Sequence, residues 1–143
     1  MQVRVEKIYS KPVEKVYSTA KELQLLAKQI PIIRKVEILE EGQNWVKARW
    51  FAHLDIAGMS QSLSWVQKDT WDDEKKTCAF EMTEGQFKKY QGIWEFHPDE
   101  KGCRAVLTVE YDAGLGLLGP FFQQILNKLV RDSCEMWLTA LEK

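Results

Sequence analysis

The sequence lacks the features of a membrane protein, a secreted protein or a disulfide-bonded scaffold. No stretch approaches the roughly 18 uninterrupted apolar residues of a membrane span, and the N-terminal segment MQVRVEKIYS has no apolar signal-peptide core. The three cysteines, Cys78, Cys103 and Cys134, are an odd number, and their spacing fits neither a zinc site nor a disulfide framework. We therefore expect a soluble, cytoplasmic protein with reduced thiols and no structural metal.

Blocks of like charge and histidine pairs are also missing. The 20 Lys and Arg residues are interleaved with 21 Asp and Glu residues, which gives a net charge of −1, so no nucleic-acid partner is expected. The two histidines, His53 and His97, have no second ligand at metal spacing. No GxSxG, CxxC or glycine-rich phosphate loop occurs. The sequence therefore predicts no cofactor, no metal and no catalytic residue.

The chain does have a clear order of periodic segments, typical of one α+β domain over residues 1–143. A first strand at 2–10 precedes two short helices, which break near Glu22 and stop at Pro31. The long helix at the end, from Pro120 to Lys143, carries an apolar stripe at helical spacing. Between these helical parts, six strands are expected at 33–41, 45–56, 60–71, 77–83, 87–97 and 103–112.

Alternation within the strands predicts which face meets the long helix. Gly92, Trp94 and Phe96 share one face, which we expect to point at the helix. In the strand near 65, Gln67 and Asp69 fall on the same face as Trp65. That polar pair indicates either a wet, incompletely filled interior or a strand end that emerges into solvent, and the pattern favours the second reading.

A straight helix cannot follow a curved sheet everywhere, so the space between them is a candidate pocket for an apolar ligand. Tyr and Trp suit such a wall because each joins a large apolar body to one hydrogen-bond donor. The alternative is that these aromatic residues pack a filled core. The residues expected to line the pocket are Trp50, Trp65, Tyr90, Trp94 and Tyr111 from the sheet, and Phe122, Ile125 and Leu129 from the helix.

The segment before the long helix combines three glycines with several large apolar residues. We expect Leu115, Leu117 and Leu118 to form a moving lid over the pocket. The alternative is a fixed hydrophobic cover at one end of the domain. An apolar loop of this kind could also contact a membrane transiently or another subunit, so a monomer or weak dimer is expected.

The order of elements resembles a known family. The run Ile8-Tyr9-Ser10-Lys11-Pro12-Val13-Glu14-Lys15-Val16-Tyr17 is similar to the strand-to-helix entry of START-like (SRPBCC, helix-grip) domains. Pro31 before Val36, the Gly92-x-Trp94-x-Phe96 strand, the turn ending at Gly102 and the C-terminal helix follow in the family's order. The resemblance spans essentially the whole chain and is strongest to the polyketide cyclase/dehydrase and coenzyme Q-binding branch. It implies a curved antiparallel sheet of about seven strands that wraps the long C-terminal helix.

The resemblance also implies a function. A cavity in this fold would bind or transport a small hydrophobic ligand such as a lipid, quinone or polyketide. A second reading is a polyketide cyclase/dehydrase (aromatase), whose relatives use an arginine with Tyr, Trp or His side chains in the cavity. Alternation places Arg49 outside, which weighs against that reading. A third reading is a ribosome-associated or other protein-interaction module.

Overall fold

The computed structural model describes the backbone of residues 1–56, 58–112 and 119–142, and the side chains of these except 56, 59 and 119–123. The predicted order of elements is confirmed. The elements are β1 (Gln2–Tyr9), α1 (Val13–Ala20), α2 (Leu23–Gln29), β2 (Ile33–Glu41), β3 (Trp45–Ile56), β4 (Met59–Asp72), β5 (Thr77–Glu84), β6 (Lys89–Asp99), β7 (Gly102–Asp112) and α3 (Gly119–Ala140).

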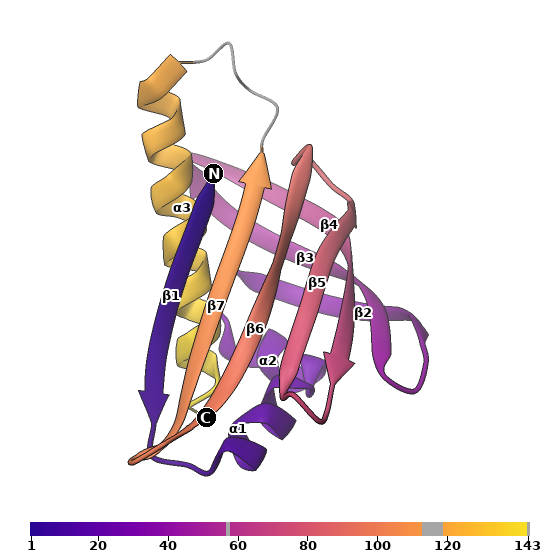
Figure 1. Ribbon diagram of the computed structural model, residues 1–143. Helices are drawn as coiled ribbons and strands as arrows, with labels where there is room; N and C mark the ends of the chain where they lie inside the picture. The colour runs from indigo at the N-terminus through magenta and orange to yellow at the C-terminus, as the bar shows by residue number, and fades with distance from the viewer. Residues whose placement is uncertain (57, 113–118, 143) are drawn as a thin grey trace.

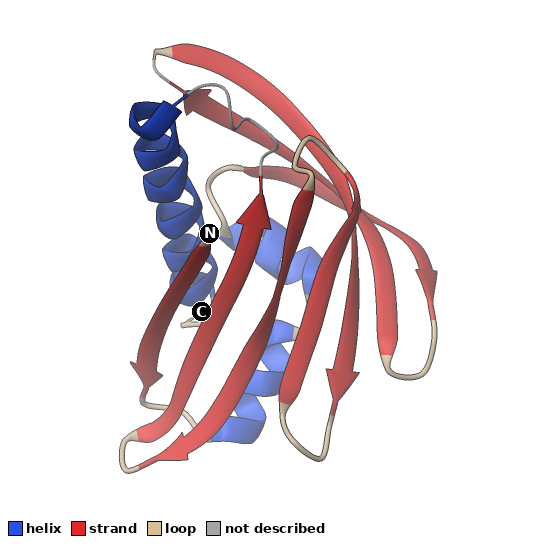
Figure 2. Ribbon diagram, turned by 45° about the horizontal axis from the view of Figure 1, so that its top comes forward, coloured by secondary structure: helices blue, strands red, loops and turns tan. Residues whose placement is uncertain are grey.

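The strands form one curved sheet around α3. They make a seven-stranded antiparallel sheet in the order β1-β7-β6-β5-β4-β3-β2. The helix α3 lies along the inner face beside β1 and β7, while β2, β3 and β4 curve away behind it (Figure 1). Helices α1 and α2 connect the two edge strands and cover one end of the sheet (Figure 2). This is the START-like helix-grip fold.

Alternation along the strands builds the core. In β7, Ala105, Leu107 and Val109 face inward and are buried, and the stripe of α3 that includes Val130 and Leu138 packs on the same side. Each Val or Leu side chain contributes about 1.5–3 kcal/mol when it is fully buried. The period of two in the strands and the period of 3.6 in the helix are therefore satisfied by one shared interior.

Three contacts fix α3 to the sheet on different sides. The Tyr9 hydroxyl in β1 donates a hydrogen bond to the Leu138 carbonyl at 2.6 Å, and the Tyr111 hydroxyl in β7 donates to Asn127 Oδ1 at 3.0 Å. Trp137 reaches the other half of the sheet, where its ring packs edge-to-face against that of Trp50 of β3, with 4.9 Å between the ring centroids. The helix is thus held at both halves of the sheet, and the space between these contacts is available for a cavity.

Two glycines allow close approaches that another residue would block. At Gly102, φ is +144°, and an added Cβ would lie 2.4 Å from the Lys11 carbonyl oxygen at the entry to α1. At Gly92, an added Cβ would lie 2.6 Å from the ring of Phe80. The absent side chain at Gly92 therefore leaves room for the Phe80 ring on the inner face.

The structure corrects both ends of one predicted strand. Strand β6 begins at Lys89 instead of 87, so Phe87 belongs to the β5–β6 loop, and it ends at Asp99 instead of 97. His97 lies within β6, paired with Arg104 of β7. In the described ranges, no helix combines the length and hydropathy needed to cross a membrane.

Candidate ligand-binding site

A cavity of about 310 Å³ lies between the inner face of the sheet and the helices α2 and α3. Most of its lining side chains are aliphatic or aromatic, and they come from strands β3 to β7 as well as from both helices. The curvature of the sheet explains the cavity, because β3 and β4 turn away from the line of α3 while β1 and β7 stay against it (Figure 1). The interior is therefore partly open on the side of β3 and β4.

The structure places five of the eight residues predicted for the wall at the cavity, namely Trp50, Trp65, Tyr90, Trp94 and Leu129. Tyr111 and Ile125 are not among the lining residues. The side chain of Phe122 lies outside the described residues, as do the lid residues Leu115, Leu117 and Leu118.

Tyr111 shows why the predicted wall differs from the observed one. It faces inward as alternation requires and is buried, but its hydroxyl is hydrogen-bonded to Asn127 of α3. It lies in β7, which is the part of the sheet that packs closely against the helix (Figure 1). The strand period gives the direction of a side chain but not the distance to the element opposite.

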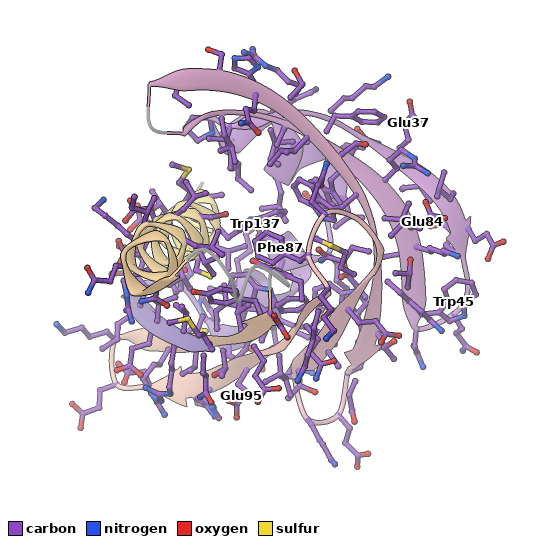
Figure 3. The ribbon with its side chains drawn as sticks, turned by 90° about the horizontal axis from the view of Figure 1, so that it is seen from above. Glu37, Trp45, Glu84, Phe87, Glu95 and Trp137 are labelled. Carbon is purple, nitrogen blue, oxygen red and sulfur yellow. The ribbon has the colours of Figure 1, made fainter. Side chains whose placement is uncertain are left out.

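Four aromatic residues outside the predicted wall also line the cavity, namely Trp71, Phe80, Phe87 and Trp137. Trp137 projects from α3 toward the sheet, and Phe87 turns inward from the β5–β6 loop (Figure 3). The Phe87 ring packs against the rings of Tyr90 and Tyr111, with centroid separations of 5.3 Å and 5.8 Å. Trp137 belonged to the apolar stripe of the helix, so a signal for it existed in the sequence. Phe87 had none, because a loop has no period.

A line of polar side chains crosses this apolar wall along β4. The indole N–H of Trp65 donates to Gln67 Oε1 at 3.2 Å, and Gln67 Nε2 donates to Asp69 Oδ1 at 2.9 Å. All three residues line the cavity, and Asp69 is only 7% exposed. The strand end at Asp69 therefore does not emerge into solvent, which reverses the reading that the pattern favoured.

Burial sets the protonation of the groups that face the cavity. Loss of hydration raises the pKa of the Asp69 carboxyl to about 6, and the hydrogen bond from Gln67 lowers the pKa by a smaller amount. Burial also raises the pKa of the Cys134 thiol to about 12, and it raises the pKa of Tyr90 and of Cys78 well above their usual ranges. At neutral pH the carboxylate of Asp69 is thus the charged group at this wall, while the thiols and the phenol stay neutral.

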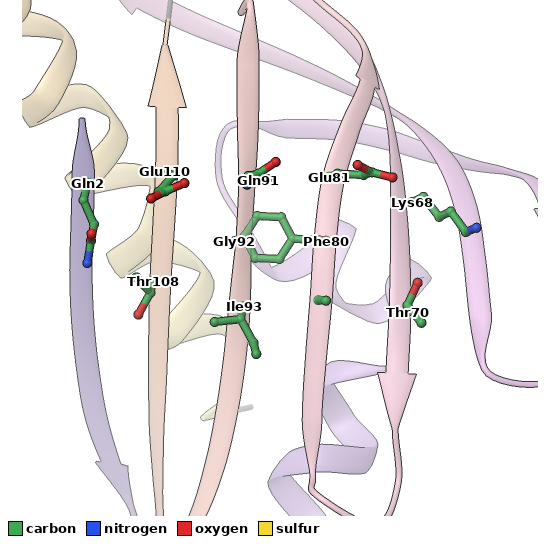
Figure 4. Close-up of a pocket in the computed structure, with 11 residues that line it drawn as sticks. Gln2, Lys68, Thr70, Phe80, Glu81, Gln91, Gly92, Ile93, Thr108 and Glu110 are labelled. Carbon is green, nitrogen blue, oxygen red and sulfur yellow. The ribbon is translucent and has the colours of Figure 1, made fainter.

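A second hollow lies on the outer face of the sheet (Figure 4). It has a volume of about 440 Å³, and its rim includes Lys68, Glu81, Gln91 and Glu110. Phe80 contributes to both hollows, since its ring lies at Gly92, where no side chain covers the strand. The mixed charge of this rim and its open position make the outer hollow a poor site for an apolar molecule.

Among the described residues, the side chains that line the inner cavity include neither a set of metal ligands nor an arginine. Within the part of the chain that the structure describes, no group of three or more His, Cys, Asp or Glu side chains could hold a metal ion. Arg49 points to the outside, as alternation predicted, where its guanidinium pairs with Glu84 at 3.1 Å. The polar groups at the inner cavity include the line Trp65, Gln67 and Asp69, together with Tyr90 and Ser133, so hydrogen bonding and one carboxylate charge are available there.

Several solved structures have the same architecture as this protein. A crystal structure of TTHA0849 from Thermus thermophilus is 30% identical, with a TM-score of 0.90, covering 99% of this chain and 94% of that one. The Zhui aromatase/cyclase from Streptomyces sp. R1128 is 23% identical over 99% of this chain and 91% of that one, with a TM-score of 0.84. A START superfamily protein from Mycobacterium smegmatis is 18% identical over 99% and 93% of the two chains, with a TM-score of 0.75.

The last two structures are too distant in sequence to show more than the shared fold. A search of the curated proteins found no significant match. The family model described as polyketide cyclase / dehydrase and lipid transport, however, matches residues 1–143. With the helix-grip fold and an apolar cavity under α3, this match shows that the chain belongs to the polyketide cyclase/dehydrase and lipid transport family.

Proposed function

We propose that this protein binds a small hydrophobic molecule in the inner cavity and carries it without covalent chemistry. The observation that supports the proposal most directly is the cavity itself, about 310 Å³ in volume and lined mainly by apolar and aromatic side chains. Concave, mostly apolar sites with a few placed polar groups are typical of small-molecule binding. The family description, which includes lipid transport, agrees with such a role.

Binding would be driven by removal of apolar surface from water on both sides. Trp50 and Trp65 on the sheet and Trp137 on the helix would all sense an occupant, since each lines the cavity. Titration with N-phenyl-1-naphthylamine, an apolar fluorescent probe that is neutral at pH 7, should therefore give saturable binding together with a change in tryptophan emission.

Two variants on α3 distinguish binding in the cavity from binding elsewhere on the protein. Leu129 lines the cavity and Ile125 does not, although both are half-buried on the same helix. Leu129→Trp should weaken probe binding by about ten-fold or more, equivalent to about 1.4 kcal/mol, because the indole occupies the cavity. Ile125→Trp should leave binding nearly unchanged. Absence of saturable binding in the unaltered protein would exclude the carrier function.

A polyketide cyclase/dehydrase is the second candidate. It is favoured by the family description and by the carboxyl of Asp69, whose raised pKa of about 6 suits proton transfer near neutral pH. The cavity also holds further hydrogen-bonding groups, including Tyr90 and Ser133. A carboxyl group of this kind could remove or return a proton during loss of water from a poly-ketone.

The enzyme reading has its own test. A poly-β-ketone thioester would be incubated with the protein. Mass spectrometry would follow the formation of the cyclised product from which water has been lost. An enzyme that uses Asp69 should lose about 10²- to 10⁴-fold in rate in Asp69→Asn. Saturable binding of N-phenyl-1-naphthylamine without any dehydration of the poly-ketone would favour the carrier.

A further inference from the structure

The charge at the cavity wall is unbalanced. Asp69 is the one Asp, Glu, Lys, Arg or His side chain among the described residues that line the cavity. Lys68, its neighbour in the chain, points to the outer face, where its ammonium lies 5.0 Å from the Trp45 ring. Lys21 is paired with Asp73 in the turn after β4, and its ammonium lies 4.7 Å from the centre of the Tyr17 ring and 5.6 Å from that of the Trp71 ring. Neither lysine is one of the side chains that line the cavity.

The hydrogen bonds along β4 have a direction that ends on the carboxylate. Because the Trp65 N–H occupies Gln67 Oε1, the amide of Gln67 is oriented with its nitrogen toward Asp69. An ionised carboxyl group has two oxygens with about four acceptor positions, and Gln67 fills one of them. The wall therefore offers acceptor capacity and negative charge at one point.

Aromatic side chains surround that point. Phe80 lies directly across from Asp69 in the β4–β5 pairing, and Trp71 is the next inward-facing residue of β4. Side chains directly opposite in an antiparallel pair have Cβ atoms about 5 Å apart. Aromatic faces attract organic cations, and they do so most strongly where water is excluded. A carboxylate beside aromatic rings is a suitable environment for an organic ammonium group.

We propose that the inner cavity selects an apolar ligand that carries a protonated amino group, with the ammonium bound at Asp69 against Phe80 and Trp71. This inference rests on the proposed binding function. An ammonium would supply the opposite charge and hydrogen-bond donors in addition to the one from Gln67. A neutral alcohol would supply only a donor, and a carboxylic acid would place a second negative charge beside the first.

Three probes of nearly equal shape test this selection. 1-Naphthylmethylamine is cationic at pH 7.5, 1-naphthylmethanol is neutral, and 1-naphthoic acid is anionic. We expect calorimetric titration of the unaltered protein to show the amine binding at least about ten-fold more tightly than the alcohol, with the acid weakest. Asp69→Asn should reduce the affinity for the amine to near that of the alcohol, and it should change the affinity for the alcohol much less than that for the amine.

A matched control removes a carboxylate elsewhere. Asp55→Asn changes an exposed residue of β3 that accepts a hydrogen bond from Ser60, and it should preserve the ranking of the three probes. A second measurement needs no variant: in protein labelled with ¹³C at aspartate carboxyls, the Asp69 resonance should shift more with the amine than with the alcohol.

The outcomes distinguish this inference from the proposed function. Equal affinities for amine, alcohol and acid would overturn the selection for an ammonium group while leaving the cavity as a binding site. A preference for the amine that survives in Asp69→Asn would equally overturn the role of Asp69. Failure of all three probes, the neutral alcohol included, would remove the proposed function along with the inference.

Discussion

The carboxylate of Asp69 is destabilising in its present position. Its folded-state pKa of about 6 lies above the ordinary value of 3.8, because burial penalises the charged form. The folded protein therefore holds this proton more tightly than the unfolded chain does. Stability from this group is highest below about pH 4, falls as the pH rises toward 6, and stays lower above that by up to about 3 kcal/mol. A buried charge with such a cost is consistent with a role in binding.

Asp69→Asn should accordingly stabilise the protein near neutral pH. The amide keeps an oxygen for the hydrogen bond from Gln67 and removes the buried charge. Urea unfolding at pH 7.5 should show a gain of up to about 3 kcal/mol, and the gain should shrink toward zero at pH 4. A loss of stability at pH 7.5 would show that the carboxylate is compensated by an interaction other than that with Gln67.

Asp73, four positions along the chain, provides a control because its pKa is shifted in the opposite direction. Hydrogen bonds from Lys21 and then Tyr17 lower the pKa of its exposed carboxyl. A lowered pKa contributes stability that is present above the unfolded value and is lost as the pH falls through the folded value. Asp73→Asn should therefore destabilise the protein at pH 7.5, and the difference should diminish in acid.

Neighbouring side chains of helix α3 differ in how tightly they meet the sheet. Leu138 is buried at 3% exposure, and its carbonyl accepts the hydrogen bond from Tyr9. Leu129, more than two turns earlier, is half-buried and lines the cavity. The helix therefore combines side chains that pack against the sheet with side chains that face the proposed ligand.

Truncation at these two positions should have unequal effects. Leu138→Ala should cost about 2–5 kcal/mol, because the removed side chain leaves a void in a packed core. Leu129→Ala should fall at or below about 2 kcal/mol, because part of its surface already faces open space. Chemical denaturation of both variants measures the contrast. Equal and large losses would indicate that the cavity is closed around Leu129.

The β5–β6 loop contributes a gate-like side chain. Phe87 lies against Tyr90 and Tyr111 and forms part of the cavity wall. We expect Phe87→Ala to speed both association and release of N-phenyl-1-naphthylamine in stopped-flow measurements, because the ring no longer narrows that part of the cavity. Lys88→Ala, at the exposed neighbouring position, should leave both rates unchanged. Unaltered rates in Phe87→Ala would place the entrance elsewhere.

At the scale of the whole molecule, the three thiols report on cooperative unfolding. Cys78, Cys103 and Cys134 are at most 2% exposed, and burial raises the pKa of each. Both accessibility and thiolate content are therefore low in the folded state. Their reaction with 5,5′-dithiobis(2-nitrobenzoic acid) should be slow in buffer and should accelerate for all three together as urea is raised. Mass spectrometry of each site would reveal any thiol that reacts ahead of unfolding.

The sequence by itself determined the order of elements and the inward face of the strands whose alternation is clear, such as β6 and β7. These follow from local rules, since a period of two or of 3.6 is written into the residues and Gly or Pro marks the breaks. Trp50 and Phe96 are buried as the alternation predicted, and the family resemblance rested on the same order of elements. Strand β6 was the least well bounded: it begins at Lys89 instead of 87 and ends at Asp99 instead of 97, because Phe87 fits a strand or a loop equally well and Pro98 suggested a turn.

Only the tertiary structure decided what each inward face meets. Alternation put Tyr111 and Asp69 on inward faces alike, yet Tyr111 packs against α3 while Asp69 lines an open cavity. The difference comes from the curvature of the sheet, which brings β7 close to the helix and carries β4 away from it (Figures 1 and 3). Curvature is a property of seven strands paired together, and no single strand encodes it.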